Sequence, residues 1–257
     1  MENKNEIITK KENGILTIKI NRPKKKNAFN SYIMDQLFEL LSSVETDDSI
    51  KIVYFTAVGD TFSSGNDFNN FFDKKEERLL IELKFFIDSL INFKKITVAG
   101  VNGMSVGISM TMLALFDFVV CAESAFFIVP FIQTFQSPEA CSSLLFPRIF
   151  GKAMGNHLLL NGGVITSEEA KTAGFVSHVF ENESFETDAY DFVLKLSKHT
   201  MDLMIKYKEM INRNGREELL KVNEYEVNEL AKSWNSPEFD KIKKMMLEKK
   251  NGGNPKF

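Results

Sequence analysis

The chain has 257 residues, with 32 Lys and Arg against 35 Asp and Glu, so its formal net charge is −3. This balance excludes a generally basic nucleic-acid binder. Hydrophobic residues make up 44% and charged residues 26% of the sequence, which is typical of a globular protein and excludes a disordered or fibrous one. The length favours one domain, or one domain with a small appendage.

The termini and the cysteines bear on location. Cys121 and Cys141 are too few to form a disulfide framework in a chain of this length, so we expect a reducing compartment. The first six residues carry charges of both signs and no apolar run, which argues against a secretory signal or a transit peptide. No stretch approaches the ~18 apolar residues of a membrane span. The C-terminal residues 254–257, NPKF, only distantly resemble the Ser-Lys-Leu peroxisomal targeting signal.

The first half of the sequence predicts alternating strands and helices. Residues 7–20 alternate around Gly14 and predict a β-hairpin, and Asn30 caps a predicted amphipathic helix that follows it. Buried strands are predicted at 51–56, 96–101 and 117–121, helices at 75–93 and 108–115, and loops at 59–67 and 103–107. This succession indicates a layered α/β fold.

From residue 138 onward, strand signals fade apart from 176–180, and helical patterns dominate. Helices are predicted to start at Ser167 and to cover 185–198, 201–213, 217–232 and 237–250. The last of these suits either a helix over a neighbouring subunit or ligand, or a solvated terminal helix. We therefore expect an α/β core over residues 1–185 and a helical C-terminal region over 186–257.

Several common catalytic motifs are missing. His157, His178 and His199 stand alone, without HExxH, CxxC or GxSxG, so we expect no metal site and no Ser-His triad. No phosphate-binding GxxxxGK[ST] occurs, and no GxGxxG follows a strand.

Two glycine-containing loops each follow a predicted strand and precede a probable helix. They read FSSGNDF at 62–68 and NGMSVGIS at 102–109. Backbone N–H groups at a helix start have no intrahelical acceptor, so two such loops could together supply two donors to one oxyanion. Spacing alone favours ordinary glycine turns.

A longer set of motifs resembles the crotonase, or enoyl-CoA hydratase/isomerase, superfamily. The motifs are INRPKKKNAF at 20–29, FSSGNDF at 62–68, VNGMSVG at 101–107, LNGG at 160–163 and EAKTAGFV at 169–176. They occur in order over roughly residues 10–185. The resemblance implies a core of repeated ββα units with a helical C-terminal region, a homotrimer, and acyl-CoA thioester substrates. It implies no separate cofactor, because coenzyme A is part of the substrate.

The resemblance also implies which reaction is open to the chain. The two glutamates that hydratases use to activate water fall at Thr111 and Phe131, neither of which can exchange a proton near neutral pH. Residues 136–141, QSPEAC, instead resemble the QSPE stretch of the peroxisomal-type 3-enoyl-CoA to 2-enoyl-CoA isomerases, whose glutamate is the catalytic base. That glutamate is Glu139 here. By itself, a carboxylate after Pro138 could also be an exposed residue at a helix start.

One carboxylate suffices for moving a double bond, because the same group can take a proton from the α carbon and return it to the γ carbon. The dienolate formed between these steps needs N–H donors, which the resemblance assigns to the backbone of Asn66 and Ile108. We expect a dry aromatic tunnel to keep Glu139 basic. Its expected members are Phe62, Phe68, Phe127, Phe131 and Phe135.

The coenzyme A end of the substrate is expected to meet the loop that carries Lys24, Lys25 and Lys26, although such a run could also be solvated. By resemblance, the substrate and coenzyme A contacts would further include Ala28, Ser64, Gly65, Asp67, Phe68, Gly107 and Phe131. Asp67 could instead bond the backbone of its own turn. Lys249 or Lys250 could add a charge.

The sequence therefore predicts an isomerase of fatty-acid β-oxidation that converts 3-enoyl-CoA to 2-enoyl-CoA, with the peroxisome as the expected compartment and the mitochondrion or cytoplasm as alternatives. Two alternatives for the activity stay open, a non-catalytic acyl-CoA-binding module and an acyl-CoA thioesterase. Chain-length and cis/trans preference depend on tunnel depth, which is a tertiary property.

Overall fold

Ten strands form two sheets in the part of the chain that the computed structural model describes, residues 6–71 and 76–250. The larger sheet has the order β1-β2-β3-β5-β7-β10 and the smaller one β4-β6-β8-β9. The strands are β1 (Ile7–Glu12), β2 (Ile15–Ile20), β3 (Ile52–Ala57), β4 (Thr61–Ser63), β5 (Ile96–Val101), β6 (Met104–Val106), β7 (Phe118–Ala122), β8 (Phe126–Ile128), β9 (Val164–Thr166) and β10 (His178–Phe180). Neighbours are parallel except for β1 with β2 and β8 with β9.

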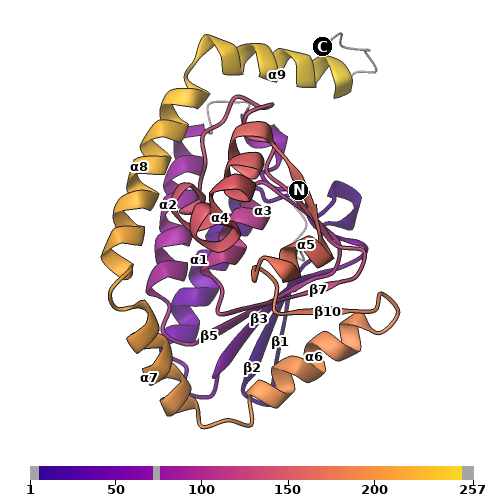
Figure 1. Cartoon of the computed structure of the whole chain (residues 1–257), viewed down its shortest axis with the longest axis vertical. Coiled ribbons are helices and arrows are strands. Elements are labelled where there is room, and N and C mark those ends of the chain that lie inside the picture. The colour runs from indigo at the N-terminus through magenta and orange to yellow at the C-terminus, as the bar shows by residue number, and fades with distance from the viewer. Residues whose placement is uncertain (1–5, 72–75, 251–257) are drawn as a thin grey trace.

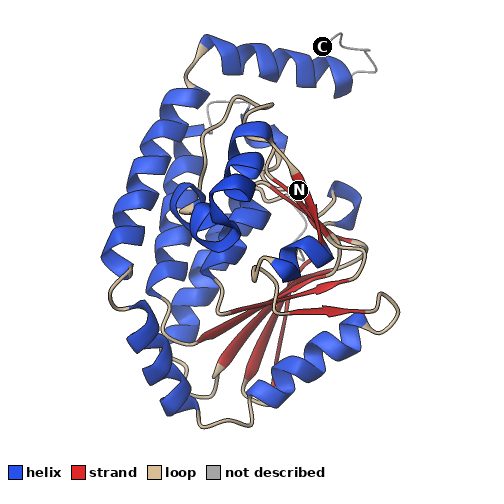
Figure 2. Cartoon of the chain, in the orientation of Figure 1, coloured by secondary structure: helices blue, strands red, loops and turns tan. Residues whose placement is uncertain are grey.

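Helices surround the two sheets (Figures 1 and 2). The α-helices are α1 (Ser31–Glu45), α2 (Glu76–Asn92), α3 (Ile108–Thr111), α4 (Ser142–Asn161), α5 (Ser167–Thr172), α6 (Phe185–Leu196), α7 (Met201–Asn212), α8 (Arg216–Trp234) and α9 (Pro237–Lys250). Short 3-10 helices lie at Pro23–Lys25, Phe68–Phe71 and Met112–Leu115. No helix in residues 6–71 and 76–250 is long and apolar enough to cross a membrane.

Three successive segments repeat the same ββα pattern. Each of β3, β5 and β7 in the large sheet leads into a short strand of the small sheet, β4, β6 or β8, and then into a helix, α2, α3 or α4. The expected α/β fold of repeated ββα units with a helical C-terminal region is therefore confirmed.

The short strands correct the sequence analysis. Residues 59–67 and 103–107 were expected to be loops throughout, but they contain β4 and β6, which pair with each other. β8 and β9 were also unexpected. A strand of three residues is too short to display a period of two, and its hydrogen-bond partners are distant in sequence.

The hairpin and the predicted helix starts are confirmed. Residues Asn13 and Gly14 between β1 and β2 both have positive φ, as a two-residue hairpin turn requires. The side chain of Asn30 accepts the N–H of Ile33 at the start of α1. Thr166 and Glu169 form a capping box at the start of α5.

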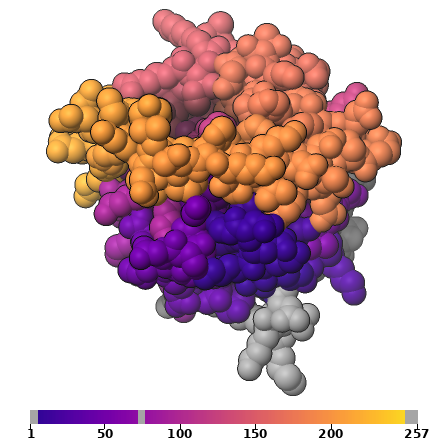
Figure 3. Space-filling view, turned by 90° about the horizontal axis from the view of Figure 1, so that it is seen from below, coloured from indigo at the N-terminus to yellow at the C-terminus, as the bar shows by residue number. Residues whose placement is uncertain are grey.

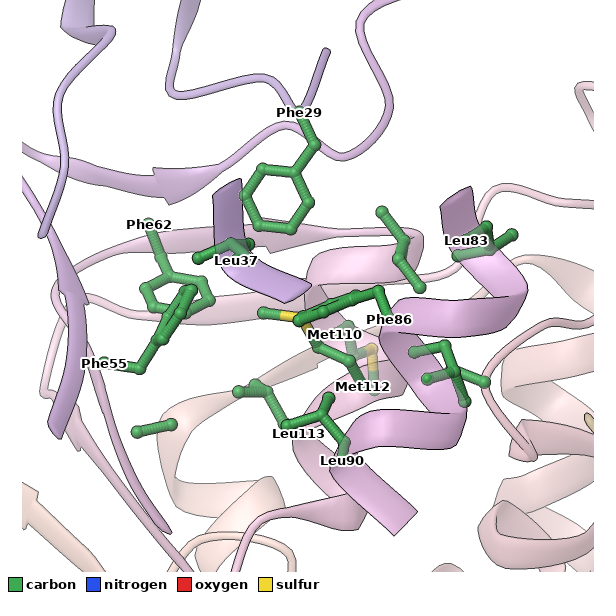
Figure 4. Close-up of a cluster of buried hydrophobic side chains, with 14 of the residues drawn as sticks. Phe29, Leu37, Phe55, Phe62, Leu83, Phe86, Leu90, Met110, Met112 and Leu113 are labelled. Atoms are coloured by element: carbon green, nitrogen blue, oxygen red, sulfur yellow. The ribbon is translucent and has the colours of Figure 1, made fainter. Parts of the chain in front are cut away.

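The alternation along the strands separates two buried clusters on the two faces of the large sheet. On β2, Leu16, Ile18 and Ile20 pack into the central core, against α1 and α2, whereas Ile15 packs toward α6 on the opposite face. Figure 4 shows part of the central core, where Phe62 and Met110 lie among side chains from both sheets and from α2.

The C-terminal helices wrap around the core. α6 covers the outer face of the large sheet, α7 crosses its lower end, and α8 runs alongside α2 (Figure 1). Seen from below, the orange segment of α6 and α7 forms a band beside the indigo N-terminal strands (Figure 3). The boundary at residue 185 stays a prediction.

Candidate active site

Two glycine-containing loops meet at the ends of β4 and β6. Gly65 lies so close to the second loop that a Cβ on it would stand 2.6 Å from the carbonyl oxygen of Val106. Gly107 has φ 58° and ψ −126°, a conformation that side-chain-bearing residues avoid, and it immediately precedes α3. Both loops therefore depend on glycine at the point where their backbones approach each other.

Ser109 joins the two loops. Its hydroxyl oxygen lies 2.9 Å from the carbonyl oxygens of both Ser63 and Val106, and it accepts the N–H of Val106 at 2.8 Å. The side chain is fully buried. Sequence reasoning missed Ser109, because a serine in the first turn of a helix is common and its partner Ser63 is 46 residues away.

The backbone N–H groups of Asn66 and Ile108 are free. Within residues 6–71 and 76–250, neither donates to an acceptor, whereas the carbonyl of Gly107 accepts the N–H groups of Met110 and Thr111. The two predicted donors thus sit on adjoining loops held together by Ser109. Such a pair of unpaired donors can stabilise a negatively charged oxygen.

The segment that carries the lysines runs alongside the first loop. The N–H of Ser64 donates to the carbonyl of Lys26 at 2.9 Å, and the N–H of Phe29 donates to that of Gly65 at 2.8 Å. Ala28 is buried between these contacts. The structure therefore brings together Ala28, Ser64 and Gly65 from two distant segments, as the sequence analysis expected.

Lys24, Lys25 and Lys26 are exposed on and after the short helix at Pro23–Lys25. No ion pair involves them among the described residues, whereas many other lysines of the chain are paired. Three exposed ammonium groups that form no ion pair among the described residues suit an anionic ligand.

Asp67 has a structural role. Its Oδ2 pairs with Arg22 at 2.9 Å, and its Oδ1 accepts the N–H of Asn69 at 3.0 Å. Arg22 also pairs with Glu6 at 2.9 Å and donates to the carbonyl of Ala28 at 2.5 Å. Both carboxylate oxygens of Asp67 are thus engaged within the protein, which is the turn role that the sequence left open. The sequence analysis did not single out Arg22, whose partners lie 16 and 45 residues away.

Glu139 is buried immediately before α4, with only 1% of its surface exposed. This excludes the alternative of an exposed residue at a helix start. Its Oε2 is buried and has no hydrogen-bond partner among the described residues. Burial, and to a lesser extent the nearby carboxylate of Glu226, raises the pKa of Glu139 to about 8. A carboxylate that is unpaired and costly to ionise is a strong candidate for a general base.

Glu226 approaches the same segment from α8. It is 2% exposed, and its two oxygens accept the backbone N–H groups of Cys141 at 2.6 Å and Ser143 at 2.8 Å. Burial raises the pKa of Glu226, while these hydrogen bonds oppose the rise. Sequence reasoning missed it, because no local pattern distinguishes it from the other glutamates of α8.

The positions that hydratases use for water activation are occupied as expected. Thr111 is fully buried, and its hydroxyl lies 3.3 Å from the carbonyl of Gly107. Phe131 is 3% exposed, and its ring lies 3.7 Å from where a Cβ on Gly107 would stand. Phe131 therefore lies against the second loop.

Four of the five expected tunnel phenylalanines belong to the central core or pack against it, and Phe135 does not. Phe62 is in the central core (Figure 4), and Phe127 packs on Phe175 with ring centroids 5.6 Å apart. Phe135 is 44% exposed. Phe68 packs instead on Phe71, with centroids 5.6 Å apart. The expectation was wrong for Phe135, because the path of a loop, which sequence spacing does not fix, decides where a ring points.

An aromatic cluster contacts the segment that precedes Glu139 in the sequence. Phe71 packs edge-on against Trp234 and Phe239, with centroids 4.9 and 5.3 Å away. The indole N–H of Trp234 donates to the side chain of Gln136 at 3.2 Å, three residues before Glu139. The end of α8 and the start of α9 therefore pack against the segments that carry the site. The side chains of Lys249 and Lys250 and the C-terminal residues 254–257 lie outside the described part of the chain.

Comparison with known proteins agrees with this geometry. The family model described as enoyl-CoA hydratase/isomerase matches residues 10–254. Enoyl-CoA delta isomerase 2 of Rattus norvegicus is 40% identical over 238 residues, which are 90% of this chain and 61% of that protein. The chain thus spans about three fifths of the length of that relative.

Further relatives include enoyl-CoA delta isomerase 3, peroxisomal, of Mus musculus, 38% identical over 85% of this chain and 70% of that protein. Testis-specific chromodomain protein Y 2 of Homo sapiens is 34% identical over 90% of this chain and 44% of that protein. Among solved structures, an enoyl-CoA hydratase/isomerase from Pseudoalteromonas atlantica T6c is 29% identical, covers 98% of this chain and 99% of its own, and superposes with a TM-score of 0.88.

The ββα core, the two adjoining loops and the buried Glu139 thus occur in a chain that one family model matches almost throughout. The protein belongs to the enoyl-CoA hydratase/isomerase family.

Proposed function

We propose that the chain is an enoyl-CoA isomerase that moves a double bond from position 3 to position 2 of a fatty acyl-CoA. The observation that carries the proposal is the burial of Glu139 with one carboxylate oxygen that has no hydrogen-bond partner among the described residues. Thr111 and Phe131, which stand at the positions that hydratases use, cannot activate water. The chain is 40% identical to a protein named as an enoyl-CoA delta isomerase, and this similarity supports the proposal.

The reaction proceeds by a proton shift. The Glu139 carboxylate removes a proton from carbon 2, and the electron pair of that C–H bond moves toward the thioester carbonyl, giving a dienolate. The N–H groups of Asn66 and Ile108 stabilise the dienolate oxygen, each donor contributing about 2.7–4 kcal/mol. The protonated Glu139 then returns its proton to carbon 4, and the carbonyl re-forms with the double bond at position 2. No cofactor takes part, since every proton and electron stays within Glu139 and the substrate.

The coenzyme A portion binds at the other end of the site. Its phosphates meet the ammonium groups of Lys24, Lys25 and Lys26, and its adenine lies beside Ala28 and Ser64. The acyl portion passes Gly65, Phe68, Gly107 and Phe131. The protein acts as a homotrimer in fatty-acid β-oxidation, and the peroxisome is its compartment. The relative named as peroxisomal supports the compartment.

The proposal is tested by incubating the protein with 3-hexenoyl-CoA and following the ultraviolet absorbance of the conjugated 2-enoyl thioester. Wild type and Glu139→Gln are compared, with free thiol measured in the same samples. We expect turnover in wild type, loss of at least about 1,000-fold in the variant, and no free thiol. A matched control is Glu224→Gln, an exposed glutamate of α8, which should keep full activity.

The other outcomes separate the alternatives. Release of free thiol, abolished in Glu139→Gln, would identify a thioesterase in which Glu139 activates water. Binding of the ester without turnover would identify an acyl-CoA-binding module. Either outcome would overturn the isomerase.

A further inference from the structure

The backbone that follows Glu139 is held in an unfavourable conformation. Ala140 has φ 56° and Cys141 has φ 62°, although neither is glycine. Left-handed conformations at two successive non-glycine residues persist only where the surrounding structure enforces them. Some neighbouring group must therefore fix this turn.

The first turn of α4 lacks a cap of its own. Cys141 occupies the N-cap position, and its side chain forms no capping hydrogen bond. Without a partner from elsewhere, the buried N–H of Cys141 and the partly buried N–H of Ser143 would be left unpaired, at a helix start that favours negative charge. Both N–H groups instead donate to Glu226 of α8, one to each carboxylate oxygen, at 2.6 and 2.8 Å.

Glu226 is itself anchored. One helical turn earlier, the side chain of Asn223 donates to Asp88 of α2 at 2.9 Å and to the carbonyl of Lys84 at 3.3 Å. The thiol of Cys141 donates to the carbonyl of Leu219 at 3.2 Å. α8 is thus fixed both to α2 and to the segment that follows Glu139.

We propose that Glu226 is the positioning residue for Glu139: its bidentate hold on the N–H groups of Cys141 and Ser143 fixes the left-handed turn that aims the Glu139 carboxylate. This inference rests on the proposed isomerase function and deepens it. A base that serves two carbons of one substrate needs a rigid backbone and an unpaired carboxylate. Glu226 bonds residues that follow Glu139, so it makes the backbone rigid and leaves the Glu139 carboxylate available for the substrate.

The charge of Glu226 has a second effect on Glu139. Two titratable groups face Glu226 from the segment that precedes α4, Glu139 and Cys141. One helical turn away, where α8 packs on α2, α2 carries Asp88 and Lys84, which form an ion pair at 2.6 Å. Glu226 raises the pKa of Glu139, so removing its charge lowers that pKa. The acid limb of kcat/KM then moves to lower pH, which a purely structural role of Glu226 would not cause.

Three variants of the full chain test the inference, with 3-hexenoyl-CoA as the probe. Glu226→Gln keeps the shape but removes the charge and one acceptor. Glu226→Asp keeps the charge but shortens the reach. Glu224→Gln makes the same chemical change on an exposed position of the same helix. We expect kcat to fall roughly 10- to 100-fold in both Glu226 variants, with KM changed less than about twofold.

The pH profiles distinguish the two effects. The acid limb should move to lower pH in Glu226→Gln and stay in place in Glu226→Asp, whereas Glu224→Gln should match wild type throughout. Wild-type kcat in Glu226→Gln, or a loss confined to KM with an unmoved acid limb, would overturn the inference. If Glu226→Gln does not fold, wild-type kcat in Glu226→Asp would overturn it. A wild type without isomerase activity would instead overturn the proposed function.

Discussion

Replacing Glu139 by glutamine should make the protein more stable while making it inactive. The pKa of Glu139 in the folded protein is about 8, against an ordinary value of 4.5. The folded state therefore binds one more proton than the unfolded state between these two pH values, so the free energy of unfolding falls as pH rises from 4.5 to 8. Because glutamine does not titrate, the free energy of unfolding of Glu139→Gln does not fall in this way as the pH rises.

The magnitude follows from the difference between the two pKa values. At 1.36 kcal/mol per pH unit, the full penalty above pH 8 is about 5 kcal/mol, and about 3 kcal/mol of it applies at pH 7. These are upper bounds, because water entry and relaxation around the ionised carboxylate reduce the cost of burial. Between pH 5 and pH 9, the advantage of Glu139→Gln over wild type should grow by up to about 4 kcal/mol.

Urea denaturation at fixed protein concentration measures this advantage. The protein has a single tryptophan, Trp234, which is 2% exposed and whose fluorescence reports unfolding of the C-terminal helices near the site. Circular dichroism on the same samples checks that the transition is cooperative. The exposed Glu224→Gln is the control and should run parallel to wild type. If Glu139→Gln also ran parallel to wild type from pH 5 to pH 9, the burial argument for a basic Glu139 would be refuted.

Three further predictions concern the loops and the substrate. Gly107→Ala should lower kcat for 3-hexenoyl-CoA about 100-fold with a small change in KM, because alanine avoids the φ and ψ of Gly107 that place the N–H of Ile108. A wild-type kcat in this variant would contradict the assignment of Ile108 as a donor. Ser109→Ala should lower the free energy of unfolding by about 2 kcal/mol in urea denaturation, since it leaves a buried N–H unpaired, and an unchanged midpoint would show that the loops hold without it. Replacing the three lysines at 24–26 by alanine should raise KM about tenfold with kcat unchanged, and added salt should abolish the difference in KM between this variant and wild type. A KM that changes neither with the substitution nor with salt would show that the coenzyme A phosphates bind elsewhere.

The parts of the fold that the sequence predicted are those governed by local patterns. The hairpin around Gly14, the cap at Asn30 and the start of α5 all follow from residues a few positions apart, and all are confirmed. The short strands β4, β6, β8 and β9 were missed, because a strand of three residues is defined by a partner strand from elsewhere in the chain.

In the candidate site, too, the residues that the sequence predicted lie in local motifs, and those that it missed have distant partners. Motifs placed Glu139, Asn66 and Ile108, and the structure adds that Glu139 is buried and that the two loops touch. Arg22, Ser109 and Glu226 were missed, because each acts through partners tens of residues away. The expected aromatic tunnel was wrong for the exposed Phe135, because composition alone does not say which face of a loop carries a ring.

The contact between Glu226 and the residues after Glu139 also constrains how the protein acquires its site during folding. The bonded residues are 85 and 83 positions apart, so their contact must close a long loop, at an entropic cost that local helix contacts avoid. On the ribosome, the ββα core can form while α8 is still being synthesised. The turn after Glu139 then reaches its final geometry only when α8 docks. Nascent or C-terminally clipped chains would therefore keep most of the sheet structure but lack a correctly oriented Glu139. Catalytic activity would appear late in folding, when the last helices dock.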